Sequence, residues 1–308
     1  MKKYFIFILL IALIASAGFR LAYLPYSQDI SESQFSVKRG DGSRDIALNL
    51  ERHNLIKWAP IFRVSVLARG IAGELKAGEY FLSPSMNIPQ IADKLTRGDV
   101  IKISVTIPEG FTQRQIEEKL GFELPGGNLE GFLFPDTYQF SFGFSAEEAI
   151  EKMRNNFESK LGEELRDDIS LQNKTVLEIV TMASLIEKEV ISLQDKKLVS
   201  GILWKRLEIN MPLQIDATLA YLSGQDGWTF DEMRRDISLL KEIDSAYNTY
   251  KYLGLPPGPI CNPGLESIIA AVYPTESDYW YYLSTPQGET VFNEALQGHN
   301  IARAEYFK

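Results

Sequence analysis

The feature that most constrains the fold is a helical run of apolar residues that contains a carboxylate. Residues 176–190 place their aliphatic side chains at the three- and four-residue spacing of one broad helix face. Because such a face must be buried, we expect this helix to lie in the core of a globular domain. Glu187 falls inside the apolar sector, between Val176 and Val180. The other side of the helix carries Glu178, Thr181, Ser184, Lys188 and Glu189.

Glu187 supports two interpretations. Burial of a lone carboxylate is costly, so its pKa rises and it holds a proton near neutral pH, as a general acid must. Alternatively, a Lys or Arg from elsewhere in the core forms a structural ion pair with Glu187. Helical periodicity does not decide between them.

Composition excludes several classes of function. The chain has 308 residues, which is enough for two domains, and a net charge of -9, which opposes non-specific binding to nucleic acid. The single cysteine, Cys261, excludes an intramolecular disulfide. With only His53 and His299, a multi-histidine metal site is not expected.

The N-terminus combines two lysines with an apolar run over residues 4–19. This pattern favours a transmembrane anchor over residues 1–24, with the lysines in the cytoplasm and the remaining chain outside it. The alternative is a cleaved signal peptide, because Ala15-Ser16-Ala17 resembles a signal-peptidase site.

The rest of the chain predicts an α+β fold, because helices and strands mix without a βαβ rhythm. A strand near residues 35–37, a Gly-Asp-Gly turn and a helix capped by Ser43 resemble the LysM module, a small carbohydrate-binding unit. We divide the chain into the anchor 1–24, a LysM-like subdomain 25–105 and a catalytic domain 106–308. The other expected elements are a strand at 78–82, helices at 88–95, 146–161 and 197–207, and strands within 273–292.

Several sequence blocks carry a wider resemblance. They lie at residues 133–138, 183–189, 211–218, 247–250, 254–264 and 299–300. In this order they resemble the YceG-like family of endolytic murein transglycosylases, from about residue 35 to the end.

The resemblance implies cleavage of the β-1,4 bond between N-acetylmuramic acid and N-acetylglucosamine within a glycan strand, leaving a 1,6-anhydro end. It implies no metal or organic cofactor. It assigns the catalytic glutamate to Glu187, which would donate a proton to the leaving oxygen and then accept that of the 6-hydroxyl.

Two alternatives stay open. A muramidase-type hydrolase would use Asp216 or Glu189 as a second carboxylate, although side chains two residues apart on a helix, such as Glu187 and Glu189, diverge. An inactive peptidoglycan-binding anchor is the non-enzymatic alternative.

The same blocks supply candidate substrate-binding residues. Gln214 and Asp216 could hold sugar hydroxyls and acetamido groups, although Asp216 could instead cap a helix. The remaining candidates are Tyr247, Asn248, Tyr250, Asn262, His299 and Asn300. His299 and Asn300 rest on the resemblance alone, and Thr290 stands where the family often has a histidine.

The resemblance and the predicted anchor together indicate where in the cell the chain is expected and which partners it would have. The chain would be a single-pass protein of the bacterial inner membrane, with its catalytic domain on the periplasmic side. Its partners would be glycan strands and penicillin-binding proteins or other cell-wall synthesis proteins.

Overall fold

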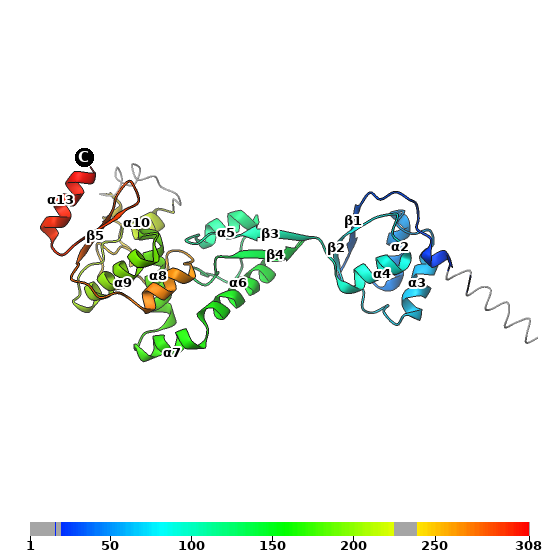
Figure 1. The fold of residues 1–308 in the computed structure, drawn as a ribbon, viewed down its shortest axis with the longest axis horizontal. Coiled ribbons are helices and arrows are strands. Elements are labelled where there is room, and N and C mark those ends of the chain that lie inside the picture. Colours follow the sequence, from blue (N-terminus) through cyan, green and yellow to red (C-terminus); the bar gives the residue numbers. More distant parts are fainter. Residues whose placement is uncertain (1–15, 17–19, 225–238, 308) are drawn as a thin grey trace, which may run out of the picture. The chain divides into compact units, whose positions relative to one another are not determined.

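The computed structural model describes residue 16, residues 20–224 and residues 239–307. Within them the chain is α+β, as predicted, with helices and three two-stranded sheets (Figure 1). It divides into two compact units, one formed by Met1–Ser104 with Gln139–Phe144 and the other by Val105–Tyr138 with Ser145–Lys308.

Most of the anchor predicted at residues 1–24 lies outside the described residues. Within the described part of the chain, no helix is both long enough and apolar enough to cross a bilayer. The anchor therefore stays a prediction.

The first unit is built around one antiparallel strand pair. Its elements are β1 (Ser33–Val37), α2 (Ser43–Arg52), α3 (Ala59–Ala68), β2 (Gly78–Leu82) and α4 (Ile88–Arg97). β1 pairs with β2 so that Phe35 lies opposite Tyr80, and both side chains are buried among the aliphatic residues of the helices. Because buried and exposed residues alternate along the strands, one face of the β1–β2 pair packs against the helices and forms the core of this unit.

Turn and cap residues set the helix ends in this unit. α2 begins one residue earlier than predicted, because Gly42 rather than Ser43 is the N-cap and its N–H donates to the Asp45 carboxylate. α4 is capped by Asn87 and ends at Gly98, which adopts the left-handed conformation with φ 74°. The helix predicted at residues 88–95 is confirmed, and it continues to Arg97.

Two strands cross the division between the units. β3 (Lys102–Thr106) pairs with β4 (Thr137–Ser141). The pairing continues where the Phe142 N–H donates to the Ile101 carbonyl at 2.9 Å. Through these contacts residues 139–144 belong to the first unit. The predicted domain limits, 25–105 and 106–308, were each continuous in the sequence.

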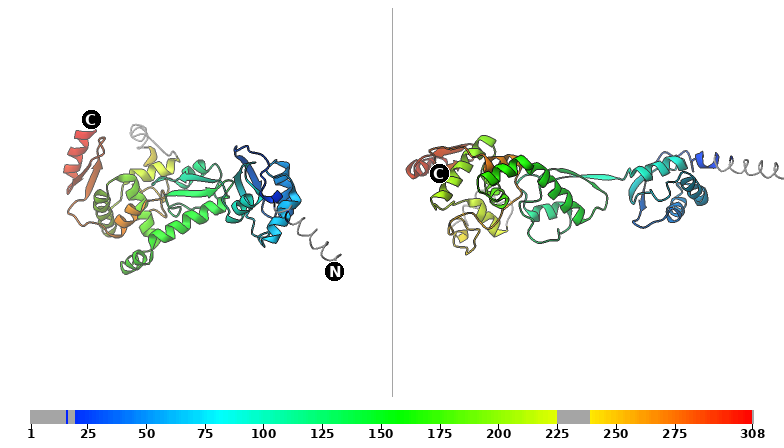
Figure 2. Two further views of the ribbon diagram at one scale, coloured as in Figure 1. Left: turned by 45° about the vertical axis from the view of Figure 1, so that its right-hand side comes forward. Right: turned by 90° about the horizontal axis from the view of Figure 1, so that it is seen from below.

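The second unit is mainly helical. Its helices are α5 (Gln113–Leu120), α6 (Ala146–Leu161), α7 (Glu163–Leu171), α8 (Val176–Glu189), α9 (Leu193–Glu208), α10 (Asp216–Ser223), α12 (Leu265–Val272) and α13 (Leu296–Tyr306). α8 lies in the core and packs against α9 and α12 (Figure 1). β5 (Tyr281–Ser284) and β6 (Thr290–Asn293) form an antiparallel pair within the predicted strand region, and α13 packs on it (Figure 2).

The burial predicted for α8 is confirmed, but the predicted polar side is wrong in part. Thr181 and Ser184 are as buried as the aliphatic residues around them. Ser184 donates to the Thr181 carbonyl at 2.7 Å and accepts from the Ile260 N–H at 3.0 Å. The segment before α12 therefore covers the second side of α8, and the hydroxyl satisfies polar groups that would otherwise be buried without partners.

Candidate active site

Glu187 lies in the last turn of α8, surrounded by three hydrogen-bond donors. Lys196 Nζ is 3.4 Å from each carboxylate oxygen. The Gly264 N–H donates to Oε2 at 3.0 Å, and the Ser267 hydroxyl donates to the same oxygen at 2.5 Å. The Glu187 side chain is 9% exposed and that of Lys196 only 3% exposed.

These contacts correct one expectation about Glu187. The carboxylate is almost buried, as the helical pattern predicted, but it is not alone. Its donors replace the hydration that burial removes, and Lys196 balances its charge. The ion pair considered as the alternative is therefore present.

Local structure explains why these groups meet. The chain turns sharply between α8 and α9, where Ser192 caps α9 by accepting from the Asp195 N–H at 3.1 Å. This turn brings Lys196, in the first turns of α9, back to Glu187. Gly264 is the N-cap of α12, so the free N–H groups of a helix start face the carboxylate.

A second carboxylate, that of Glu109, lies beside this group. A Cβ added to Gly264 would fall 1.9 Å from Glu109 Oε1, and one added to Gly110 would fall 3.5 Å from Glu187 Cγ. Partial burial raises the pKa of Glu109, the Glu187 charge raises it further, and Lys196 opposes the shift. Glu109 carries no functional signal in the sequence, because residues 108–110 show only a turn.

A separate polar cluster surrounds Glu189. Burial and the nearby Asp216 charge raise the pKa of Glu189 to about 7, against the lowering effects of the Tyr282 hydroxyl and Arg206. The Tyr250 hydroxyl donates to Asp216. Its members come from α9, α10, β5 and residues 247–250, and within the described residues none of them donates a hydrogen bond to the Glu187 carboxylate.

Arg206 holds this cluster in place through the backbone. Its guanidinium donates to the Leu213 carbonyl at 2.8 Å and to the Trp280 carbonyl at 3.0 and 2.5 Å. Arg206 is 5% exposed, and its planar fork joins α9 to both neighbouring segments. In the sequence alone, Arg206 has no feature that indicates this role.

The first two candidate substrate residues lie near that cluster. Gln214 is exposed in a left-handed conformation with φ 56°, and its N–H donates to the Thr249 carbonyl. Asp216 opens α10, but the N-cap is Ile215 and the carboxylate accepts from Tyr250. The helix-capping interpretation of Asp216 is therefore wrong.

Two candidate amides lie inside the unit and face no solvent. Asn248 is 0% exposed and donates to the Lys241 and Ile243 carbonyls at 3.0 and 2.9 Å. Asn262 is also 0% exposed; it donates to Glu130 at 3.0 Å and accepts from the Leu133 N–H at 2.9 Å. Both residues hold loops together in this structure, so the expectation that they contact glycan is not met.

The last three candidates are partly or fully accessible. Tyr247 is half-buried, with its ring 5.2 Å from that of Tyr221. The His299 ring stacks on Tyr281 at 5.5 Å, and burial followed by the Arg303 charge lowers its pKa. Asn300, the next residue on α13, is exposed.

Thr290 connects β6 to α9 rather than to the Glu187 group. Its hydroxyl donates to Asp195 at 3.2 Å. Asp195 follows the cap of α9, one residue before Lys196. The position where the family often has a histidine is thus linked to the active site only through the start of α9.

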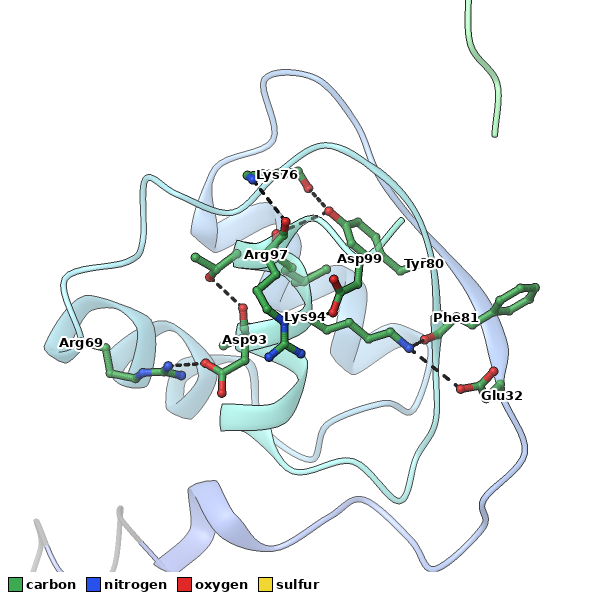
Figure 3. Close-up of polar contacts among 12 residues, drawn as sticks. Glu32, Arg69, Lys76, Tyr80, Phe81, Asp93, Lys94, Arg97 and Asp99 are labelled. Carbon is green, nitrogen blue, oxygen red and sulfur yellow. Dashed lines mark hydrogen bonds and ion pairs between the residues drawn. The ribbon is translucent and has the colours of Figure 1, made fainter. Parts of the chain in front are cut away.

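The first unit has a pocket of its own along α4 (Figure 3). It is lined by Met86, Gln90, Asp93, Lys94, Arg97 and Asp99. Arg69 pairs with Asp93, and Arg97 pairs with Asp99 at 3.0 Å. Because its arginine and aspartate charges pair with one another, this pocket offers little free charge to an ionic ligand.

Comparison with known proteins identifies the family of this chain. The model of the YceG-like family matches residues 35–305. This chain belongs to the YceG-like family. The family match includes the segments that carry Glu109, Glu187 and Gly264.

Individual relatives agree with the family match. The endolytic murein transglycosylase of Bacillus subtilis (strain 168) is 31% identical, over 88% of this chain and 84% of that protein. The endolytic murein transglycosylase of Streptococcus pneumoniae serotype 2 is 28% identical over 88% of this chain, which spans only 57% of that longer protein. The crystal structure of a yceG-like protein from Listeria monocytogenes aligns with a TM-score of 0.57 and 32% identity, covering 88% of this chain and 99% of that one.

Proposed function

We propose that this chain is an endolytic peptidoglycan transglycosylase that cuts the β-1,4 bond between N-acetylmuramic acid and N-acetylglucosamine. The family and the names of its relatives support an enzyme of the lytic transglycosylase class. The observation that carries the residue assignment is the nearly buried Glu187 carboxylate, held by Lys196, Gly264 and Ser267.

Glu187 acts first as an acid and then as a base. Its proton passes to the leaving glycosidic oxygen as the bond from the anomeric carbon breaks. The muramic acid 6-hydroxyl then attacks the anomeric carbon, and its proton returns to Glu187. No water is consumed, so the product carries a 1,6-anhydro end and the enzyme is restored.

The surroundings of Glu187 suit this exchange. The hydrogen bonds from Gly264 and Ser267 both reach Oε2, whereas among the described residues Oε1 has only the longer contact with Lys196. We assign proton exchange with glycan to Oε1. Fixed donors of this kind hold a reacting carboxylate in one orientation without reorganisation during the reaction.

The hydrolase alternative with Asp216 or Glu189 has less support. Those carboxylates are close enough to each other for the charge of Asp216 to raise the pKa of Glu189, and their other contacts are with Arg206, Tyr250 and Tyr282. Neither shares a hydrogen-bond partner with Glu187 in the described structure.

The first unit and the N-terminus extend the proposal. We assign glycan binding of the LysM type to the first unit, supported by its β1–α2–α3–β2 order and antiparallel strand pair. Residues 1–24 anchor the chain in the bacterial inner membrane, with both units on the periplasmic side. There the enzyme can cut newly made strands beside penicillin-binding proteins and limit their length.

Product analysis tests this function. Wild type and Glu187→Gln are incubated with purified glycan strands, with Glu151→Gln on the exposed face of α6 as the matched control. Mass spectrometry should find internal fragments with anhydro ends, one water lighter than reducing ends, for wild type and the control only. Anhydro ends released by Glu187→Gln at the wild-type rate would contradict the assignment.

A further inference from the structure

We propose that Glu109 is a second catalytic carboxylate of the Glu187 site, which contacts the glycan and stabilises the positive charge that develops on the sugar ring during cleavage. This inference rests on the proposed function and adds a residue to it. Glu187 remains the residue that exchanges protons.

Gly264 is the point where the two carboxylates meet. Its N–H donates to Glu187, while its missing side chain leaves the space that the Glu109 carboxylate fills, since an added Cβ would fall 1.9 and 2.7 Å from the two Glu109 oxygens. The backbone at Gly264 has φ -73° and ψ 168°, which any residue adopts. A side chain at this position would therefore displace the Glu109 carboxylate, although the backbone conformation itself suits any residue.

The Glu109 carboxylate is open to a ligand, whereas the Glu187 carboxylate is mostly covered by its neighbours. Glu109 is exposed, and within the described residues no hydrogen bond or ion pair to its carboxylate is found. Glu187 has three donors and is 9% exposed. A glycan that reaches Glu187 must therefore approach past a carboxylate whose oxygens can still accept from hydroxyl or acetamido groups.

The charges around Glu109 favour its interaction with a positively charged transition state. Two carboxylates face it, Glu187 from α8 and Glu266 from α12, and one cation, Lys196, reduces their effect. Lys188 also lies near, with Nζ 3.7 Å from the position of a Cβ on Gly110. Once the Glu187 proton passes to the leaving oxygen, the Glu187 carboxylate and those of Glu109 and Glu266 repel one another, and a cationic sugar ring beside them relieves that repulsion. Such an interaction is stronger in the transition state than in the ground state, which is what accelerates a reaction.

The first experiment separates this charge from simple substrate binding. Glu109→Gln keeps the size and the hydrogen-bonding capacity of the side chain, and Glu151→Gln on the exposed face of α6 is the matched control that removes an exposed charge outside the site. We expect Glu109→Gln to lower kcat roughly 10²-fold with KM changed less than about threefold, and Glu151→Gln to retain activity. An unchanged kcat, or a change confined to KM, would overturn the proposal.

The second experiment tests the contact with Gly264. Gly264→Ala should lower activity in the wild-type background, because the new methyl displaces the Glu109 carboxylate. In a Glu109→Ala background the same substitution should have little further effect, since the clash is gone. Equal losses in both backgrounds would show that Gly264 acts without Glu109 and would overturn the link. Thermal unfolding of each variant verifies that the loss is not one of folding.

The products distinguish failure of this inference from failure of the proposed function. If wild type releases no anhydro ends, the transglycosylase function itself is wrong. If wild type releases them and Glu109→Gln does so equally well, only the role of Glu109 is wrong. Reducing ends that depend on Glu109 would assign it to water activation and would likewise overturn the charge-stabilising role.

Discussion

Glu189 is the residue whose ionisation should be visible in the stability of the protein. Its pKa rises from 4.5 to about 7 on folding, mainly through burial. Below pH 4.5 both the folded and unfolded states hold the proton, so there is no penalty. Between pH 4.5 and 7 the unfolded state releases its proton first, so the free energy of unfolding falls as the pH rises. The total loss is on the order of 1 to 3 kcal/mol, and it is fully present above pH 7.

Thermal unfolding of Glu189→Gln tests this effect. The variant should be more stable than wild type at pH 8 and equal to it at pH 4.5. Glu178, on the same helix, is the control of opposite sign, because hydrogen bonds from Thr175 lower its pKa. Glu178→Gln should be less stable than wild type at pH 8, and this difference in stability should be smaller in acid. If Glu189→Gln follows the pH dependence of wild type, the buried-acid description is wrong.

Individual residues also show what a sequence can reveal about a site. Glu187 could be selected because a carboxylate in an apolar helix face is a local irregularity, visible within one window of sequence. Its partners could not be selected, because Gly264 and Ser267 lie 77 and 80 residues away and meet it only through packing. Glu109 has the same difficulty, since its significance depends on the empty space at Gly264. The buried Asn248 and Asn262 show the opposite error, since motif membership alone does not separate a loop-holding amide from a ligand-binding one.

At the scale of elements, long periodic segments were predictable, whereas some short elements, such as α12, were not. α6 and α8 agree with the sequence to within one residue, because several turns of apolar spacing define each of them. α12 has only eight residues and follows a segment rich in proline and glycine, so its pattern is weak. It nevertheless supplies the N-terminus that faces Glu187. The element most important for the site was therefore among the least visible in the sequence.

The segment before α12 depends on one amide. Asn262 links the Phe111 carbonyl, the Leu133 N–H and the Glu130 carboxylate, all within hydrogen-bond distance. Asn262→Ala removes one hydrogen bond each from the Phe111 carbonyl and the Glu130 carboxylate, which keep the backbone N–H groups of residue 262 and of Gln113 as donors. The Leu133 N–H loses its side-chain acceptor, so we expect a loss of about 1 to 3 kcal/mol in the free energy of unfolding. Denaturant unfolding measures the loss, with Asn300→Ala on the exposed side of α13 as the control. A loss below 0.5 kcal/mol would mean that the loop holds its position by other contacts.

For the whole molecule, the remaining question is where the site operates. The apolar run at residues 4–19, preceded by two lysines, predicts that the chain stays in the membrane fraction. A variant lacking residues 1–24 should appear in the soluble fraction and cut purified glycan strands at the wild-type rate, because no residue assigned to the site lies in that segment. Full-length Glu187→Gln, fractionated in parallel, should remain with the membranes despite its inactivity, which separates location from catalysis. Extraction of the full-length chain from membranes by alkaline carbonate would contradict a spanning anchor, whereas release only by detergent is the expected result.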